Sequence, residues 1–472
     1  MLDLSQFNDA PVAIFGLGRT GMTTARALLA SGVEVWAWDD NPDARARAEA
    51  AGLALTDLYG CRWEQVNTLV LSPGIPHTHP TPHPIARLAR DSGCAIVCDI
   101  ELMFRAEKNA AFLGVTGTNG KSTTTALIGH ILDGAGIPAR IGGNIGAPVL
   151  ALDPVAQGGC YVLELSSYQL ELTPSAAFKI AVLLNISADH LDRHGGMDGY
   201  VEAKKRIFAN QGDSDVAVIG VDDPYCKAIF ESLAHAGSKR VVPISSISRV
   251  EGGVYARDGV LHDDLEGENR AVLDMRGIAT LPGVHNWQNA AAAYAAAKTI
   301  GIESGRIVAG LQTYPGMPRR QELIAVIDGV SYINDSKATN VESAVRALAC
   351  YDMICWIAGG RSKDTALDAI APFAPRIVTA FLIGEAAAPF ERDLSGTMKV
   401  ERCGTLDVAV ERARACALEA KKSGAAVVLL SPACASFDQF RDFEDRGEAF
   451  RALVGALPGH RAELPHLKAG AI

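Results

Sequence analysis

Short apolar runs rich in valine and isoleucine alternate along the chain with alanine-rich amphipathic segments. Residues 12–15 form such a run, an amphipathic segment follows at 21–31, and the order repeats at 112–115 and 121–135. Strands that alternate with helices assemble into mainly parallel sheets with helices on both faces. Because the alternation recurs in three blocks, we expect an α/β fold in which each block forms a Rossmann-like or related parallel sheet.

The chain of 472 residues is long enough for two to four domains. A proline-rich segment at 76–84 is typical of a loop, and the strand expected at Ala111 marks a domain start. A second boundary falls near 314–322, and short strands with turns at 242–280 indicate a small β insert. We therefore expect domains at 1–108, 109–316 and 317–472.

Composition excludes several classes of protein. Hydrophobic residues make up 48% of the chain and charged residues 21%, which is typical of a globular protein. A formal charge of -10 disfavours general nucleic-acid binding, because clustered Lys and Arg must face a phosphate backbone. The ten cysteines form no C-x-x-C pair, and no apolar run approaches the roughly 20 residues of a membrane span. The first residues lack a basic segment followed by a long apolar stretch, so we expect no signal peptide. We expect a cytoplasmic protein without a membrane span.

The first glycine-rich loop, GLGRTG at 16–21, satisfies the spacing G-x-G-x-x-G between a strand and a helix. Asp39 ends the next strand, as in dinucleotide-binding proteins. Glycines let the backbone approach any pyrophosphate, so NAD, a UDP-linked ligand and a purely structural turn all stay open. Ser72 and Gly74, at the end of another strand, are expected beside this loop.

The second glycine-rich loop, GVTGTNGKSTTT at 114–125, departs from the standard phosphate-binding spacing because Val115 stands where glycine is usual. The mechanism needs only the turn beside Lys121. Loop N–H groups hold the phosphates, Lys121 neutralises the outer ones, and the Ser122 hydroxyl can ligate Mg²⁺. A turn that merely caps a helix is the alternative, and G-K-S-T in this position favours nucleotide binding.

Polar residues at two expected strand ends could complete a metal site. Glu164 stands among apolar neighbours in YVLELSS, and AVLLNISADH ends in Asp189 and His190. Taken singly, a buried Glu is more often an ion-pair member and a His more often a surface residue. Their expected position beside the phosphate-binding loop favours a role as ligands.

The run AKKRIF places Lys204, Lys205 and Arg206 together, a pattern that is most often a solvated helix face. Crowded cations also lower the pKa of a lysine. A neutral amine can take up CO₂ and become a carbamate, which converts a cation into a metal ligand. We state this as a hypothesis.

Nine motifs, read in order, resemble the Mur ligases of peptidoglycan synthesis, and they span essentially the whole chain. NDSKATN and the SPACASFDQF run are similar to those of the members that add D-glutamate to UDP-N-acetylmuramoyl-L-alanine. The central loop is shared with folylpolyglutamate synthetases and identifies only the superfamily. The motifs are TGTNGKSTTT, LELSSYQLE, NISADHLDRHG, AKKRIF, GVHNWQNAAAA, GMPRRQE, NDSKATN, AGGRSKD and LLSPACASFDQFRDFEDRG.

The resemblance implies three domains: an N-terminal one for UDP, a central ATPase, and a C-terminal one that closes over the site with the amino acid. It implies that ATP contacts Gly117, Thr118, Asn119, Gly120, Lys121, Ser122, Thr123, Asn286, Asn289, Arg320, Asp335 and Lys337. Two Mg²⁺ ions would be held by Ser122, Glu164, His190 and carbamylated Lys204, and the catalytic residues would be Lys121, His190 and Lys204.

The same resemblance implies the two substrate sites. The UDP-linked substrate would meet Arg19, Thr20, Asp39, Asp40, Ser72, Gly74, Asn144 and Gln169. D-Glutamate would meet Thr339, Lys363, Ser436 and Phe443. Arg361 stands in the GGRSK loop where the family pattern has glycine, which bears on the reach of Lys363. The carbamylated lysine is assigned to Lys204 rather than Lys205 by the A-K-x-R-I register.

The implied reaction begins with attack of the L-alanyl carboxylate on the ATP γ-phosphate, which gives an acyl phosphate that the amine of D-glutamate then attacks. His190 or Asp335 would assist removal of the amine proton. A sibling ligase for another amino acid, an NAD-dependent oxidoreductase built on GLGRTG, and a nucleotide-binding regulator are the alternatives. We expect a monomer.

Overall fold

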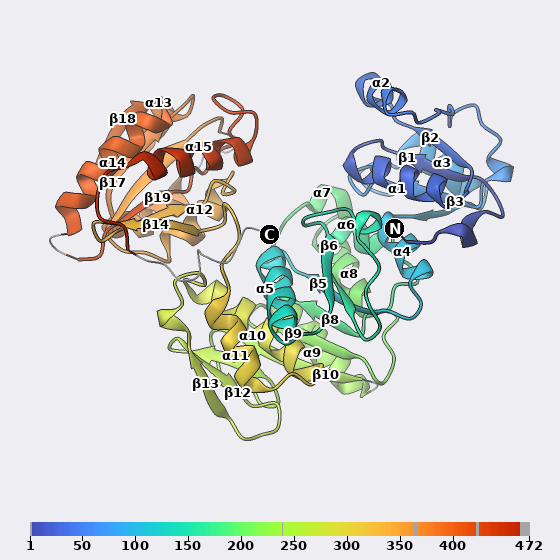
Figure 1. The fold of residues 1–472 in the computed structure, drawn as a ribbon, viewed down its shortest axis with the longest axis horizontal. Coiled ribbons are helices and arrows are strands. Elements are labelled where there is room, and N and C mark those ends of the chain that lie inside the picture. The colour runs from blue at the N-terminus through green and yellow to red at the C-terminus, as the bar shows by residue number, and fades with distance from the viewer. Residues whose placement is uncertain (1, 238, 363–366, 422–423, 463–472) are drawn as a thin grey trace. The chain divides into compact units, whose positions relative to one another are not determined.

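The computed structural model describes residues 2–237, 239–362, 367–421 and 424–462. Contacts between Cα atoms separate two compact units, which we describe individually (Figure 1). Unit 1 comprises Met1–Asp274 and His285–Gln312, and unit 2 comprises Met275–Val284 and Thr313–Ile472. Within these ranges the chain forms three sheets, in agreement with the three blocks of alternating strands and helices.

The first sheet of unit 1 has four parallel strands in the order β2-β1-β3-β4. All four residues of β1 and of β3 are buried, as expected for central strands covered on both faces. Its strands are β1 (Val12–Phe15), β2 (Val35–Trp38), β3 (Thr68–Leu71) and β4 (Ala95–Val97), and its helices are α1 (Arg19–Ala30), α2 (Pro42–Ala50) and α3 (Pro84–Asp91).

The second sheet of unit 1 has nine strands in the order β13-β12-β11-β10-β9-β8-β5-β7-β6. It is parallel from β6 to β11, and β12 and β13 add an antiparallel edge. The strands are β5 (Ala111–Thr116), β6 (Ala139–Gly143), β7 (Cys160–Glu164), β8 (Ile180–Leu183), β9 (Val216–Gly220), β10 (Arg240–Ser245), β11 (Val254–Arg257), β12 (Val260–Asp263) and β13 (Arg270–Asp274). The helices are α4 (Asp99–Ala106), α5 (Lys121–Gly134), α6 (Ser167–Glu171), α7 (Leu191–His194), α8 (Met197–Lys205), α9 (Pro224–Ala236), α10 (Val284–Thr299) and α11 (Ser304–Thr313).

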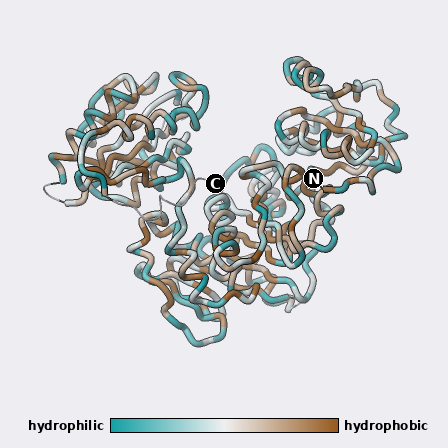
Figure 2. Tube along the Cα trace, in the orientation of Figure 1, coloured by the Kyte–Doolittle hydropathy of each residue, from teal (hydrophilic) through white to brown (hydrophobic). Residues whose placement is uncertain are grey.

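Unit 2 holds a sheet of six strands in the order β14-β15-β19-β16-β17-β18, parallel except for the β14–β15 pair. In Figure 2 the apolar colour follows its strands, and the core includes Trp356 and Phe381. The strands are β14 (Glu322–Ile327), β15 (Val330–Asn334), β16 (Ile354–Gly359), β17 (Ile377–Ile383), β18 (Val400–Gly404) and β19 (Val427–Leu430). The helices are α12 (Val341–Leu348), α13 (Ala387–Leu394), α14 (Leu406–Ala420) and α15 (Phe443–Ala456).

Short 3₁₀ helices complete the secondary structure. They span Ser5–Phe7, Trp63–Gln65, Val149–Ala151, Arg206–Phe208, Met275–Gly277 and Asp368–Arg376. No helix within the described residues is both long and apolar enough to cross a membrane.

The α/β fold predicted from the sequence is confirmed. The expected loop at 76–84 precedes α3, and the strand expected from Ala111 is β5. The short strands expected within 242–280 are β11 to β13, and they extend the nine-stranded sheet rather than forming a separate layer. The domain ranges 1–108, 109–316 and 317–472 stay a prediction.

Candidate active site

The loop between β5 and α5 has a geometry that only glycine permits at its end. Gly120, the residue before the first turn of α5, has φ +83°, in the left-handed region. A Cβ atom there would lie 2.2 Å from Asn289 Oδ1. Lys121 Nζ donates to the carbonyl oxygens of Gly117 and Thr118, each at 2.9 Å. The loop therefore wraps around the lysine ammonium and lies directly against α10.

A chain of side-chain amides fixes the tip of this loop. Asn185 Oδ1 accepts from the backbone N–H of Asn119 at 2.9 Å, and Asn185 Nδ2 donates to Asn119 O at 3.2 Å and Gln288 Oε1 at 3.1 Å. Gln288 Nε2 in turn donates to Asp222 Oδ2 at 3.1 Å. Sequence reasoning missed Asn185 and Gln288. Their only signal is that Asn185 follows the apolar run of β8 and Gln288 stands between two predicted ATP ligands.

The two asparagines predicted to meet ATP lie together on α10. Asn289 Nδ2 donates to Asn286 Oδ1 at 3.0 Å, and both side chains are buried. Through its contact with Gly120, Asn289 brings this pair to the phosphate-binding loop. The structure thus brings the predicted residues of α5 and α10 together.

Lys204, near the end of α8, is buried, with only 1% of its surface exposed. Its Nζ donates to Gly117 O at 2.8 Å and lies 4.7 Å from the centroid of the Tyr200 ring. Burial, and then the nearby charge of Lys121, hold the pKa of Lys204 well below its ordinary value. Lys205, by contrast, is only half-buried and forms a surface ion pair with Glu202. The structure therefore favours Lys204 over Lys205 as the unusual lysine.

Glu164 ends β7 with 2% of its surface exposed. Asn144 Nδ2 donates to Glu164 Oε1 at 2.9 Å, whereas Oε2 is buried without a hydrogen-bond partner among the residues that the structure describes. A buried carboxylate oxygen without a donor is costly unless a cation meets it. This atom therefore fits a bound cation.

The other predicted metal ligands differ in exposure. Ser122, in the first turn of α5, is buried, whereas His190 has φ +51° and is about half exposed, 3.5 Å from Asp189. Across the described ranges no group of three or more His, Cys, Asp or Glu is placed to hold a metal ion. The predicted set contains only two such residues, Glu164 and His190.

A cavity of about 350 Å³ in unit 1 collects residues from both glycine-rich loops. Eight residues predicted to bind ligand line it: Arg19, Thr20, Gly74, Lys121, Asn144, Gln169, His190 and Lys204. Sequence reasoning assigned no role to six other lining residues: Pro73, Gly143, Ser166, Ser167, Tyr168 and Tyr200. Asp39, Asp40, Ser72, Ser122 and Glu164 do not line it. The cavity places the expected UDP-linked and phosphate-binding residues around one space.

The first glycine-rich loop is held by its own neighbours. Ser72 Oγ donates to Gly16 O at 3.1 Å, and a Cβ atom on Gly21 would lie 1.9 Å from that same oxygen. Asp39 accepts the backbone N–H of Leu17 at 2.6 Å through Oδ2 and that of Asn41 at 2.9 Å through Oδ1. Both oxygens of Asp39 thus stabilise the loop.

Asp40 belongs to a separate polar group on the same side of the sheet. Its carboxylate accepts from the hydroxyl of Tyr59 at 3.0 Å and lies 3.2 Å from His83 Nε2. Burial, followed by the hydrogen bond to Asp40, raises the pKa of Tyr59 to about 12. Asp40 therefore faces a phenol and an imidazole.

In unit 2, two predicted residues that follow β15, Asp335 and Lys337, lie close to the start of α15 or the end of β19. Asp335 is buried, accepts from Ser431 Oγ at 2.7 Å and from Gln321 N at 3.1 Å, and burial raises its pKa to about 7. Lys337 Nζ lies 3.7 Å from the centroid of the Phe443 ring, a cation–π contact. A residue predicted for ATP thus contacts one predicted for D-glutamate.

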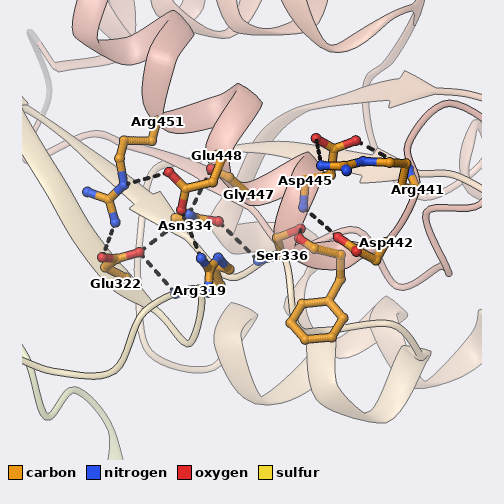
Figure 3. Close-up of polar contacts among 11 residues, drawn as sticks. Arg319, Glu322, Asn334, Ser336, Arg441, Asp442, Asp445, Gly447, Glu448 and Arg451 are labelled. Carbon is orange, nitrogen blue, oxygen red and sulfur yellow. Dashed lines mark hydrogen bonds and ion pairs between the residues drawn. The ribbon is translucent and has the colours of Figure 1, made fainter. Parts of the chain in front are cut away.

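Arg320 sits in a constrained turn before β14. Both of its neighbours have positive φ: Arg319 at +59° and Gln321 at +45°. Figure 3 shows the polar cluster that holds this turn: Glu322 Oε2 accepts from Arg319 N at 2.9 Å, and Arg319 Nη2 lies 2.9 Å from Glu448 Oε1 on α15. The backbone on either side of Arg320 is therefore fixed by α15 and the start of β14.

The start of α15 is tied to the segment after β15. Ser336 Oγ donates to Phe443 O at 2.9 Å, and Arg446 Nε donates to Ser336 Oγ at 3.0 Å. Burial lowers the pKa of Arg446 to about 10, and within the described part of the chain its Nη1 is buried without a hydrogen-bond partner. Sequence reasoning missed Arg446. Its Nη1 therefore remains a donor that no hydrogen bond uses within the described residues.

The remaining residues predicted for D-glutamate divide into described and undescribed ones. Ser436 is buried, Thr339 is half-buried, and Lys363 lies outside the described residues. Arg361, the departure from the family pattern, forms an exposed ion pair with Glu385 at 3.1 Å.

A glycine-rich loop around a lysine, an adjoining buried lysine and a carboxylate oxygen that lacks a donor define an α/β protein of the phosphate-binding class. The sequence profile of the Mur ligase middle domain matches residues 115–297. UDP-N-acetylmuramoylalanine–D-glutamate ligase of Rhodospirillum rubrum is 51% identical over 467 residues, covering 98% of each chain. The namesake from Caulobacter vibrioides is 51% identical over 464 residues, covering 97% of this chain and 98% of its own.

Solved structures agree on the fold. UDP-N-acetylmuramate–alanine ligase of Thermotoga maritima aligns over 95% of this chain and 99% of its own, with a TM-score of 0.58 and 16% identity. The D-alanyl-D-alanyl-adding ligase of Acinetobacter baumannii aligns over 79% and 81%, with a TM-score of 0.54 and 20% identity. The chain belongs to the Mur ligase family.

Proposed function

We propose that this chain is an ATP-dependent ligase that joins D-glutamate to UDP-N-acetylmuramoyl-L-alanine and forms ADP and phosphate. The observation that carries the proposal is about 51% identity, over nearly the full length of both chains, to relatives named for this reaction. The cavity supports it, because residues of both glycine-rich loops line one space. The reaction belongs to assembly of the peptidoglycan precursor, and hence to cell-wall growth and division.

Amide formation needs an activated carboxyl group, because a carboxylate is a poor electrophile. The L-alanyl carboxylate attacks the γ-phosphorus of ATP, the bond from that phosphorus to ADP breaks, and an acyl phosphate forms. Both partners are anions, so cationic groups must offset their repulsion. Lys121, held between two loop carbonyls, is the cation of the phosphate-binding loop.

The second step transfers the acyl group to the amine. The nitrogen of D-glutamate attacks the acyl carbon, and the tetrahedral intermediate expels phosphate. The amine must lose a proton, and the two candidate acceptors are His190 and Asp335. Asp335 has a pKa raised to about 7 by burial, which suits proton exchange near neutral pH.

Two Mg²⁺ ions complete the proposed site, with Ser122, Glu164, His190 and Lys204 as their ligands. The oxygen Oε2 of Glu164, buried without a hydrogen-bond partner, supports a cation at that residue. Bound magnesium would neutralise charge on the phosphates during transfer. Ser122 would present its hydroxyl from the first turn of α5, and Glu164 its carboxylate from the end of β7.

Lys204 is proposed to bind magnesium after its amine has been converted into a carbamate. Its neutral amine would attack CO₂, forming an N–C bond as one C–O π bond breaks, and release one proton to water. The depressed pKa of Lys204 supports this step, because only the neutral amine is a nucleophile. The product is an anion that can ligate a metal, which a lysine ammonium cannot.

The substrate sites follow the same assignment. The UDP-linked substrate is proposed to meet the residues of the first glycine-rich loop together with Asn144 and Gln169, and D-glutamate to meet Thr339, Lys363, Ser436 and Phe443. The three domain ranges, a cytoplasmic location and a monomeric state complete the proposal.

Release of phosphate from ATP tests the reaction. We expect release that requires UDP-N-acetylmuramoyl-L-alanine together with D-glutamate, with L-glutamate, L-alanine and diaminopimelate inactive as replacements. If one of these amino acids is the better acceptor, the chain is a sibling ligase. If no amino acid supports release, or a nicotinamide cofactor is consumed instead, the proposal is wrong.

A further inference from the structure

Three side chains on the cavity side of unit 1 form a relay to which no role has yet been assigned. His194 ends α7, and its Nε2 lies 2.9 Å from Ser167 Oγ. Its other ring nitrogen, Nδ1, lies 3.1 Å from Glu171 Oε1. Ser167 and His194 each have only 3% of their surface exposed. Ser167 lines the cavity, so the relay ends at the ligand space.

The carboxylate at one end of the relay sets the direction of every hydrogen bond in it. An ionised glutamate only accepts, so the proton between Glu171 and His194 must be carried by Nδ1. In a neutral imidazole, Nε2 then has a lone pair and accepts. With His194 neutral, the hydroxyl of Ser167 donates its proton to Nε2, and the lone pairs on its oxygen face the cavity.

Neighbouring contacts hold the relay in place. The ring of Tyr168 stacks on that of His194 with centroids 5.3 Å apart, and the guanidinium of Arg193 lies 4.7 Å from the centroid of Tyr168. Arg193 also donates to Gly74 O at 2.6 Å. His77 Nε2 lies 3.9 Å from the second oxygen of Glu171, and burial lowers the pKa of His77. The imidazole of His194 is thus clamped on its face and at both nitrogens.

The cavity wall carries both donors and acceptors, and the carboxylate of Asp189 is among the acceptors. Lys121 and Arg19 line it as cations. The amide oxygen of Gln169 already accepts from the backbone and hydroxyl of Ser166, at 2.9 and 3.0 Å, so Gln169 turns its N–H groups outward. A ligand that carries anions and an N–H group therefore needs an acceptor beside these cations, and Ser167, which the relay holds in place, is one.

We propose that Ser167 is a specificity-determining residue that accepts a hydrogen bond from the amide N–H linking the lactoyl and L-alanyl groups of the substrate. This N–H is two bonds from the carboxylate carbon that reacts, and that carboxylate is expected beside Lys121 in the same cavity. His194 and Glu171 act through Ser167 and are positioning residues. The inference rests on the proposed function and deepens it.

Steady-state kinetics with two substrates tests the contact. For Ser167→Ala we expect the KM for UDP-N-acetylmuramoyl-L-alanine to rise about tenfold, the usual effect of leaving one buried donor without its acceptor. The kcat and the KM for ATP stay within about twofold of wild type. An ester analogue, with L-lactate in place of L-alanine, keeps the carboxylate and lacks the N–H. With this analogue, Ser167→Ala and wild type should show the same KM.

Variants of His194 test the direction of the relay. The side chain in His194→Gln can donate to Glu171 and accept from Ser167. The KM of this variant should therefore stay close to that of wild type. His194→Phe keeps the stacked ring but offers no acceptor, and should resemble Ser167→Ala. His235→Gln, at an exposed position on α9, is the matched control and should leave every constant unchanged. Nitrogen-15 NMR of the His194 ring should show the proton on Nδ1.

Several outcomes would overturn the inference. One is a rise in KM for Ser167→Ala that is equally large with the amide substrate and the ester analogue. Another is a proton on Nε2 of His194. The third is a KM for His194→Gln as high as that for His194→Phe. Calorimetric binding of the nucleotide substrate without ATP or D-glutamate separates this inference from the proposed reaction. If wild type binds the substrate but forms no product, the reaction is wrong, and the affinity ratio of Ser167→Ala to wild type still decides the inference. If each variant unfolds at the wild-type Tm, the changes in KM report contacts rather than folding.

Discussion

Lys204 and Lys121 donate to the same carbonyl oxygen, that of Gly117, at 2.8 and 2.9 Å. Two ammonium groups so close together repel each other, and burial removes the water that would screen them. The less exposed of the two, Lys204, has its pKa held well below the ordinary value. The carbonyl oxygen of Gly117 therefore contacts two different lysines. Lys121 is a cation suited to bind phosphate, and Lys204 is an amine suited to stay neutral.

Removal of the Lys204 amine should abolish most activity. For Lys204→Ala we expect kcat to fall at least about 100-fold, as is typical when a residue that holds a catalytic metal is lost. Wild-type activity should fall in buffer stripped of CO₂ and return with bicarbonate. Lys205→Ala, at the adjacent half-buried position, should keep near wild-type activity and the same response. Indifference of the wild type to bicarbonate would remove the carbamate from the account.

Gly120 should not tolerate a side chain. Gly120→Ala forces a left-handed backbone on alanine, which costs about 1–2 kcal/mol, and places its Cβ against Asn289 Oδ1. We expect a lower Tm and at least a tenfold rise in the KM for ATP. Gly134→Ala, in open space at the end of the same helix, should leave the KM unchanged. Equal kinetics for the two variants would contradict the proposed role of the loop.

Asn185 should affect ATP binding although it is not itself a predicted ligand. Asn185→Ala leaves the N–H and carbonyl of Asn119 without their side-chain partners, a loss of about 1–3 kcal/mol for a buried site. We expect the KM for ATP to rise about tenfold. Asn210→Ala also loses two side-chain hydrogen bonds, to Pro174 O and Ala176 O, and should alter stability alone. An ATP KM equal to wild type in Asn185→Ala would show that the loop needs no such support.

Asp335 should make stability depend on pH. Burial raises its folded-state pKa to about 7 from an ordinary value of 3.8, so the folded protein holds this proton more tightly than the unfolded chain does. Its contribution is fully present below pH 3.8 and is lost as pH rises towards 7. The free energy of unfolding of Asp335→Asn, measured with denaturant, should therefore rise relative to that of wild type between pH 4 and 8. The exposed Asp352→Asn should show no such trend, and a parallel pH profile for Asp335→Asn would exclude the effect.

Local sequence patterns were enough to predict the α/β fold and the phosphate-binding loop. The apolar runs of β1, β3 and β5 are buried throughout or nearly so, and the glycines at 16, 21 and 120 occupy positions that a Cβ atom would obstruct. These requirements are imposed within a few residues, so they leave a readable pattern.

Long-range partners left no such pattern. Asn185 meets Gln288 across more than one hundred residues, and His194 meets Ser167 across 27. Nor does a run of charged residues reveal burial: Lys204 and Lys205 are neighbours in sequence, and only the register of α8 turns Lys204 inward. The role of such residues follows from packing, which the tertiary structure supplies.

Transfer of oxygen from the substrate carboxylate tests the central claim most directly. The substrate is prepared with ¹⁸O in the L-alanyl carboxylate and turned over with ATP and D-glutamate. The account predicts that one ¹⁸O atom appears in each phosphate released, because the carboxylate attacks the γ-phosphorus and leaves an oxygen on it when the amide forms. Phosphate free of ¹⁸O, released in step with the amide product, would contradict the acyl phosphate and the role assigned to this site.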